Sequence, residues 1–134
     1  MKLLVLVVED DPDIALMMSV SLRLAGHEVT TASTGEAALT KLVEERPQVL
    51  VLDLGLPGIG GHEVLRRVRA DHSLRGLPVV VVSAHVAPPT ISEMTSLGCD
   101  RYLTKPFDPR ELVRAVGGLP VALGTGASPA GVQG

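Results

Sequence analysis

A run of residues that is apolar at every position limits the fold of this chain more than any other feature. Residues 49–52 are all Val or Leu, Asp53 follows them, and residues 54–61 are rich in Gly and Pro. A strand that is apolar on both faces is typical of a parallel sheet covered by helices. In such sheets ligands bind beyond the carboxyl ends of the strands, where Asp53 would stand. The alternative for Asp53 is a capping role in the loop, since Asp is frequent in turns.

The rest of the chain alternates between strand and helix signals. Apolar runs predict strands at residues 3–8, 27–32, 49–53, 77–82 and 101–103. Amphipathic spacing and end signals predict helices at residues 12–25, 34–46, 60–70, 88–97 and 109–116. We therefore expect an α/β fold with an open, mostly parallel five-stranded sheet, helices on both faces and right-handed crossovers. In the flavodoxin-like form of this doubly wound fold, with strand order 2-1-3-4-5, the first and third strands would end side by side.

Several side chains are given structural roles by their local sequence. Asp11 precedes Pro12, and Asp108 precedes Pro109, so both aspartates are predicted to be helix N-caps. Asp11 is therefore interpreted as a cap rather than a metal ligand. Residues 33–36 predict a capping box that starts at Ser33.

Surface positions are also predicted. In the third helix Arg66, Arg67 and Arg69 are expected to face solvent. The surface is also the expected place of three histidines, namely His27, His62 and His72. For His85, two residues after Ser83, a place over the strand ends and a plain loop position both stay open.

Length and charge exclude several classes of protein. The 134 residues, 46% hydrophobic and 20% charged, suit one globular domain with its own core. The apolar run at residues 3–8 is too short for a signal peptide or a membrane span, so we expect a cytoplasmic protein without membrane contact. The net charge of -3 and the scattered basic residues do not favour nucleic-acid binding. Cys99 is the single cysteine, which supports neither a disulfide nor a zinc site.

Polar side chains follow the predicted strands at the edge where ligands bind. Glu9 and Asp10 follow the first strand, Asp53 the third, Ser83 the fourth and Lys105 the fifth. Three neighbouring carboxylates repel one another, and an oxygen-only site of this kind suits Mg²⁺ or Mn²⁺. An Asp carboxylate can form an acyl phosphate while a metal ion, a lysine and a hydroxyl hold the phosphoryl oxygens. The pattern thus favours phosphoryl transfer.

Four segments at these strand ends carry a resemblance to a known family. They are Val7-Val8-Glu9-Asp10, Leu52-Asp53-Leu54-Gly55-Leu56-Pro57-Gly58, Val81-Val82-Ser83-Ala84 and Leu103-Thr104-Lys105-Pro106-Phe107. In this order they resemble the CheY-like receiver domain of two-component response regulators. The resemblance covers residues 3 to about 117. Each segment alone is weak evidence, but their combination at strand ends is specific.

The resemblance implies a site for phosphorylation and a site for a metal ion. Asp53 would accept a phosphoryl group from a histidine kinase or a phosphotransfer protein, and the domain would hydrolyse its own acyl phosphate slowly. Mg²⁺, with Mn²⁺ as a possible substitute, would bind Asp10, Asp53 and the backbone carbonyl of Gly55. Glu9 would reach the ion through a water molecule.

The resemblance also implies how the signal leaves the site. Ser83 and Lys105 would contact the phosphoryl group, and the Lys105–Pro106 peptide bond would be cis. Tyr102 falls where the family keeps an aromatic switch residue. Movements of Ser83 and Tyr102 would alter the face formed by residues 91–97, 100–103 and 108–116.

The residues after the last predicted helix indicate how the domain would pass on its signal. Residues 1–117 are expected to form the receiver domain, and the Gly- and Ala-rich residues 118–134 a flexible tail. Such a tail is too short for a DNA-binding or catalytic domain. We therefore expect a stand-alone regulator that signals through its own surface, to a separate protein target or to a second copy of itself.

Some residues depart from the family pattern, and other functions stay open. Gly55 and Gly60 lack the side chains that are common at these positions, and this affects the expected lifetime of the phosphoryl group and the rigidity of the loop. The last helix is short, and this affects how the output face is built. The domain could be a phosphate relay or sink without output. An Asp-nucleophile phosphatase would need a general acid at the position of Gly55. A flavin or nucleotide module would use residues 55–61, which lack the P-loop ending.

Overall fold

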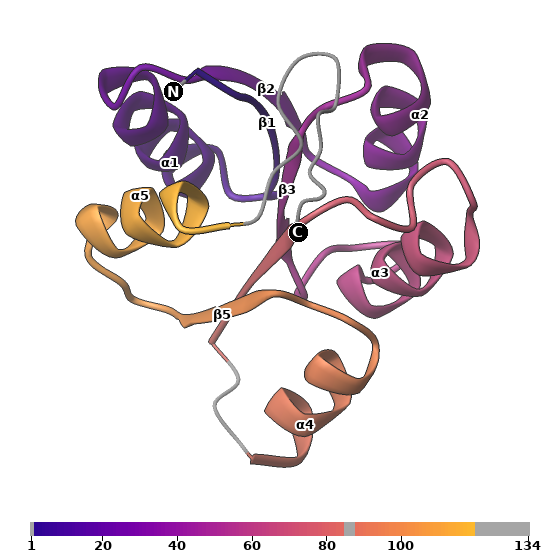
Figure 1. Ribbon diagram of the computed structural model, residues 1–134. Helices are drawn as coiled ribbons and strands as arrows, with labels where there is room; N and C mark the ends of the chain where they lie inside the picture. Colours follow the sequence, from indigo (N-terminus) through magenta and orange to yellow (C-terminus); the bar gives the residue numbers. More distant parts are fainter. Residues whose placement is uncertain (1, 85–87, 120–134) are drawn as a thin grey trace.

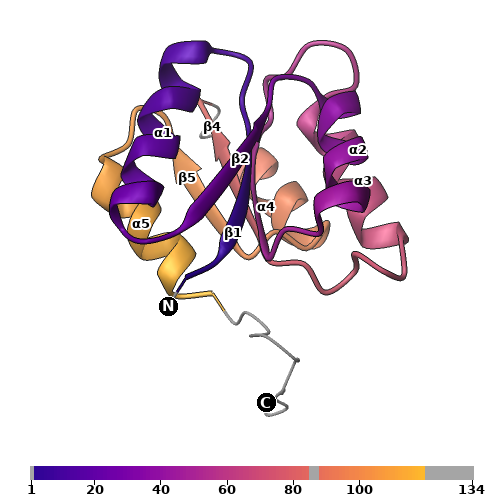
Figure 2. The same cartoon turned by 90° about the horizontal axis from the view of Figure 1, so that it is seen from above.

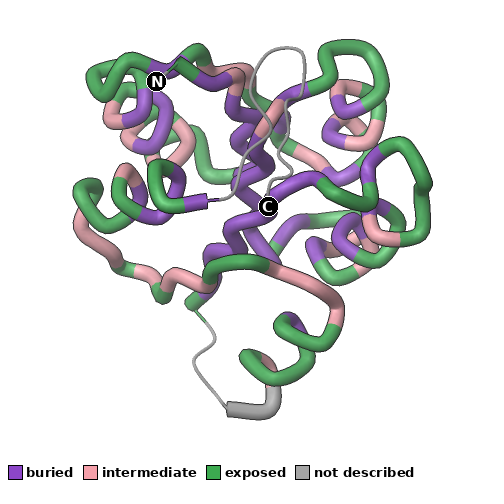
Figure 3. Tube along the Cα trace, viewed as in Figure 1, coloured by how far each residue is buried: buried purple, intermediate pink, exposed green. Residues whose placement is uncertain are grey.

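Five parallel strands form one sheet in the computed structural model, which describes residues 2–84 and 88–119 (Figure 1). The strands are β1 (Leu4–Val8), β2 (Glu28–Ala32), β3 (Val49–Asp53), β4 (Val79–Ser83) and β5 (Arg101–Thr104). Their order is β2-β1-β3-β4-β5, which confirms the predicted topology. β3 and β4 are buried throughout, because each has a strand on either side and helices over both faces (Figure 3). β4 consists of four valines followed by Ser83.

Helices cover both faces of the sheet (Figure 2). α1 (Pro12–Leu24) and α5 (Pro109–Gly117) lie on one face, and α2 (Gly35–Glu45), α3 (Gly61–Ala70) and α4 (Pro88–Ser96) lie on the other. Successive side chains of a strand point to opposite faces. Leu6 and Val8 of β1 accordingly pack with α2 and α3, whereas Val5 and Val7 pack with α1 and α5. Two apolar cores result, one on each side of the sheet.

Helix caps are partly as predicted. The Asp11 side chain accepts hydrogen bonds from the backbone N–H groups of Asp13 and Ile14, so its capping role is confirmed. Asp108 and Glu111 form a capping box at the start of α5. The capping box predicted at Ser33 is wrong, because Thr34 is the N-cap of α2. Glu36 is then the second helical residue, and a capping box requires a Glu or Gln at the third.

Of the side chains expected on the surface, one is buried and another is half-buried. His27 is buried, and its Nδ1 accepts a hydrogen bond from the Leu3 N–H at 3.2 Å. Gly26, with φ of +100°, turns the chain back so sharply that His27 lies beside the amino end of β1. Arg69 is half-buried and donates to the carbonyls of Leu77 and Gly98. It points inward because the turn after α4 lies against the end of α3.

Side chains also close the amino-terminal edge of the sheet. The Leu4 N–H donates to Gln48 Oε1 at 3.0 Å, and the Val79 N–H donates to Asp100 Oδ2 at 2.8 Å. β4 starts at Val79 rather than at residue 77, and β2 starts at Glu28 rather than at residue 27. Leu119 lies beyond the expected domain boundary at residue 117, yet it is buried in the core beside α5. Among the described residues, no helix combines the length and the apolar character needed to cross a membrane.

Candidate functional site

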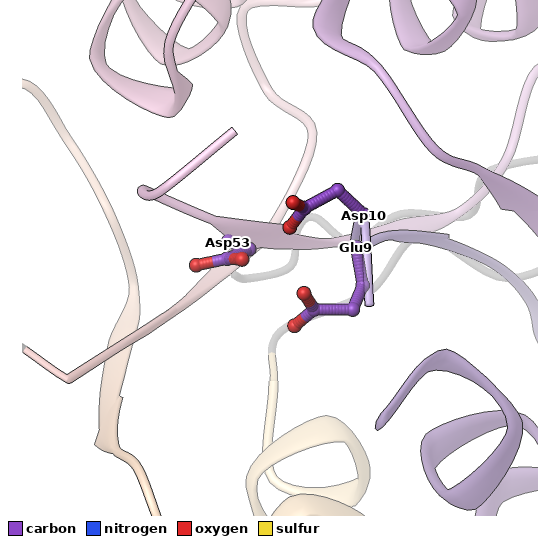
Figure 4. A group of neighbouring side chains, drawn as sticks. All are labelled: Glu9, Asp10 and Asp53. Atoms are coloured by element: carbon purple, nitrogen blue, oxygen red, sulfur yellow. The ribbon is translucent and has the colours of Figure 1, made fainter. Parts of the chain in front are cut away.

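Three carboxylates meet where β1 and β3 end (Figure 4). One oxygen each from Glu9, Asp10 and Asp53 lies within 4.8 Å of the others. Glu9 and Asp53 are buried, whereas Asp10 is exposed. Together with Ser83 and Lys105 they line a cleft of about 280 Å³. The structure thus brings together the strand-end residues that the sequence placed at one edge.

Both oxygens of Asp53 have partners within the chain. Oδ1 accepts a hydrogen bond from the Gly55 N–H at 3.0 Å, and Oδ2 lies 3.2 Å from Lys105 Nζ. Asp53 ends β3, the central strand, where it is paired with Val82 of β4, and the residue before it, Leu52, is paired with Val8 of β1. The carboxylate therefore has a fixed position and orientation.

Lys105 serves two acids at once. Its Nζ lies 2.8 Å from Glu9 Oε1 as well as 3.2 Å from Asp53 Oδ2. Burial alone would lower the pKa of Lys105, but the interactions with Glu9 and Asp53 outweigh burial and raise it. The Lys105 N–H donates to the Ser83 carbonyl at 2.9 Å, which fixes the backbone of this residue beside β4. The expected cis peptide bond between Lys105 and Pro106 is present.

Glu9 shows how unbalanced the charge of the cleft is. Burial raises its pKa to about 7, and the neighbouring Asp53 adds to this effect. Lys105 and the Asp11 N–H, which donates to Glu9 Oε2 at 3.1 Å, act in the opposite direction but do not cancel it. One lysine cannot neutralise three carboxylates, so a bound cation would lower the energy of this arrangement.

The comparisons with known proteins agree with this geometry. Residues 5–117 match the family model of the response regulator receiver domain. The chain belongs to this family. The DNA-binding response regulator MtrA of Mycolicibacterium smegmatis is 40% identical over 116 residues, which are 87% of this chain and 50% of that protein. The receiver domain described here thus spans about half the length of the curated relatives it matches.

Solved structures share the fold. The chemotaxis response regulator CheY4 of Vibrio cholerae superposes with a TM-score of 0.82 at 31% identity, covering 87% of this chain and 98% of that one. The Mn²⁺-bound form of the response regulator Rcp1 gives a TM-score of 0.74 at 28% identity, with 87% and 90% covered. A member of the fold has therefore been solved with a divalent cation, and the acidic cleft of this receiver domain offers oxygen ligands that suit such an ion.

The remaining predicted site residues lie in or near the cleft. Ser83 is buried at the end of β4. Gly55, whose backbone carbonyl is a predicted metal ligand, lies in the loop directly after Asp53. The Gly55 N–H donates a hydrogen bond to the Asp53 side chain. Tyr102 is half-buried in β5 and packs against the core beneath α4. His85 lies outside the described residues.

Two glycines that the sequence analysis did not single out are tightly packed against Asp53 or the loop that follows it. A Cβ atom on Gly61 would lie 2.4 Å from the Asp53 carbonyl oxygen, and one on Gly35 would lie 2.6 Å from the Ile59 side chain. For Gly61, the Gly60-Gly61 pair at the start of a helix was a sequence signal that could have predicted close packing. Nothing in the sequence pairs Gly35 with a loop more than twenty residues away.

Proposed function

We propose that this receiver domain accepts a phosphoryl group on Asp53 from a histidine kinase or a phosphotransfer protein, and that it signals by changing its contacts with other proteins. The observation that carries the proposal is the fixed Asp53 carboxylate, which shares Lys105 with Glu9 at the mouth of an acidic cleft. In the transfer, an Asp53 oxygen forms a bond to phosphorus, and the bond from phosphorus to the donor's histidine nitrogen breaks. The bonding electrons leave with that nitrogen.

Each residue of the cleft has a part in this reaction. Asp10, Asp53, the Gly55 carbonyl and, through water, Glu9 would hold Mg²⁺ or Mn²⁺, which would offset the charge of the phosphoryl oxygens. The Lys105 ammonium, which already lies beside Asp53, would pair with a phosphoryl oxygen. The Ser83 hydroxyl would donate a hydrogen bond to another phosphoryl oxygen. Slow self-hydrolysis of the acyl phosphate belongs to the same proposal.

The output would pass through β4 and β5. Ser83 ends β4, and Tyr102 is paired with Val81 of the same strand, so a shift of Ser83 can reach the surface formed by α4, β5 and α5. A separate target or a second copy of the chain would bind this face in the cytoplasm, by protein contacts rather than through nucleic acid or a membrane. A ligand shifts such a two-state surface only through its different affinity for the two states. A relay or sink without output is the alternative.

Intact mass spectrometry after incubation with Mg²⁺ and acetyl phosphate tests the proposal. The parent protein should gain the mass of one phosphoryl group, and Asp53→Asn should gain none. Asp13→Asn is the matched control, because Asp13 is an exposed carboxylate in the first turn of α1 and should leave phosphorylation unchanged. Phosphorylation of Asp53→Asn to the same extent as the parent would disprove the assignment.

A further inference from the structure

The loop between β3 and α3, residues 54–60, is held in place by a helix that contributes nothing to the acidic cleft. We propose that Gly35, the first residue of α2, is a positioning residue for the divalent-cation site, although it touches none of the groups that would bind the ion. The inference rests on the proposed function, because it concerns the same metal ion and the same Asp53.

The loop matters because its residue Gly55 contacts Asp53 and also carries a proposed metal ligand. Its Gly55 N–H donates to Asp53 Oδ1, and the carbonyl of the same residue is a proposed metal ligand. The loop begins where the Leu54 N–H donates to the Val82 carbonyl at 3.2 Å. Any displacement of the loop therefore changes the position of a proposed ligand and the orientation of the phospho-acceptor together.

Gly35 contacts this loop at Ile59. A Cβ atom on Gly35 would lie 2.6 Å from Ile59 Cγ1, 2.8 Å from the Ile59 carbonyl oxygen and 2.9 Å from Val64 Cγ2. Carbon atoms do not approach one another this closely in folded proteins. The Ile59 side chain could rotate, but the carbonyl oxygen belongs to the backbone. Only a glycine at position 35 therefore lets the loop keep its present path.

Other contacts also fix the loop. Leu56 is buried in the core, and Gly61 packs against the Asp53 carbonyl at its far end. A Cβ atom on Gly58 would lie 3.0 Å from Glu36 Oε2 of α2, whereas one on Gly55 or Gly60 would meet nothing closer than 3.7 Å. α2 thus contacts the loop at two positions, Gly35 and Glu36. At Gly35 an added Cβ atom would meet a backbone atom of the loop, and that atom belongs to Ile59, four residues from Gly55.

Metal sites respond strongly to small displacements of their support. Ligand distances are held to about 0.2 Å, and loss of groups that orient a ligand costs about tenfold or more in affinity. A methyl group on Gly35 would have to push Ile59 away by several tenths of an ångström to reach an ordinary contact. Alanine at the start of a helix would otherwise favour folding, since glycine is the poorer helix former. The steric effect and the helix propensity therefore act in opposite directions.

Gly35→Ala tests the inference, with Gly76→Ala as the matched control because a Cβ atom on Gly76 would meet nothing within 4 Å. Titration with Mg²⁺, followed by amide NMR, should show a dissociation constant about tenfold higher for Gly35→Ala. The control should bind like the parent. In metal-free protein the amide signals of Asp53 and Gly55 should shift in Gly35→Ala, a readout that a role confined to helix stability would not produce. Unchanged affinity together with unchanged signals would overturn the inference.

A second variant covers the case in which Gly35→Ala does not fold. Ile59→Ala removes the side chain that packs on Gly35 without adding a clash, and it should also weaken Mg²⁺ binding. Parent-like binding by Ile59→Ala would contradict the inference. Failure of the proposed function looks different, because the parent protein itself would then bind no Mg²⁺ and gain no phosphoryl mass.

Discussion

The two ends of the sheet treat polar groups in opposite ways. At the amino-terminal edge backbone N–H groups donate to side chains of the same chain, as Leu3 does to His27 and Val79 does to Asp100. At the carboxyl-terminal edge Glu9 and Asp53 are both buried and share one lysine. The first edge has polar groups paired within the chain, and the second carries an excess of negative charge that a ligand can relieve.

This difference shows that the carboxyl-terminal edge, where the reactive groups lie, is the less stable of the two edges. A buried polar group with a partner contributes modestly to stability, whereas buried like charges raise the free energy of the folded state. The pKa of Glu9, raised to about 7 by burial and by Asp53, records that cost. Changes at the amino-terminal edge should therefore destabilise the protein, and some changes at the carboxyl-terminal edge should stabilise it.

The largest expected effect is on metal binding at the carboxyl-terminal edge. Asp10→Ala should weaken Mg²⁺ binding about 100-fold, because it removes a proposed direct oxygen ligand. Glu9→Gln, the control, should weaken binding only about tenfold, since Glu9 is proposed to act through water. Because the chain has no Trp to report binding by fluorescence, calorimetry should measure both affinities. Equal losses, or a greater loss for Glu9→Gln, would reverse the two assignments.

The next effect concerns the amino-terminal edge. Asp100→Ala should lower the free energy of unfolding by about 2 kcal/mol, because the Val79 N–H loses its acceptor and Arg69 loses an ion-pair partner. Asp100→Asn keeps an oxygen that can accept from Val79 and should cost clearly less. Urea unfolding measures both values. Identical stabilities for the two variants would show that this acceptor is not what holds the edge.

A smaller change, this time an increase in the free energy of unfolding, is expected for a substitution of Asp53. Asp53→Asn leaves one lysine with one buried glutamate and keeps an acceptor for the Gly55 N–H, so it should stabilise the metal-free protein by about 1 kcal/mol. Thermal unfolding in the presence of a chelator measures this difference. Added Mg²⁺ should then raise the unfolding temperature of the parent more than that of the variant. A less stable variant in chelator would refute the idea of an over-charged edge.

The smallest effect is the pH dependence that His27 adds at the amino-terminal edge. Burial lowers the pKa of His27, so the unfolded chain binds a proton more readily than the folded protein. Stability from this group is therefore complete above its ordinary pKa of 6.5 and declines as the pH falls below it. His27→Gln should flatten that decline in urea unfolding measured from pH 8 to pH 5. His72→Gln changes an exposed histidine and should leave the profile unaltered.

The strands and helices of this architecture could be predicted from the sequence, because hydrophobic periodicity largely decides which segments form each element. The apolar run that ends in Asp53 fixed both a central strand and the side of the sheet on which the cleft lies. Contacts between distant segments could not be predicted in the same way. His27 appeared polar and was expected outside, but a tight turn at Gly26 brings it over β1. The sharing of Lys105 between two acids likewise depends on how far a side chain reaches across three strands.

The four consecutive valines of β4 have a consequence for how the chain reaches its native state. In the folded protein they are covered on both faces and paired with β3 and β5. Parallel pairing joins residues far apart in the sequence and forms late, so this uncharged segment of high β-propensity is exposed until its neighbours arrive. Pro78, directly before the valines, limits extension of the segment into an intermolecular strand. Recovery of folded protein after dilution from urea should accordingly fall as protein concentration rises, with light scattering appearing only during refolding and not in the native sample.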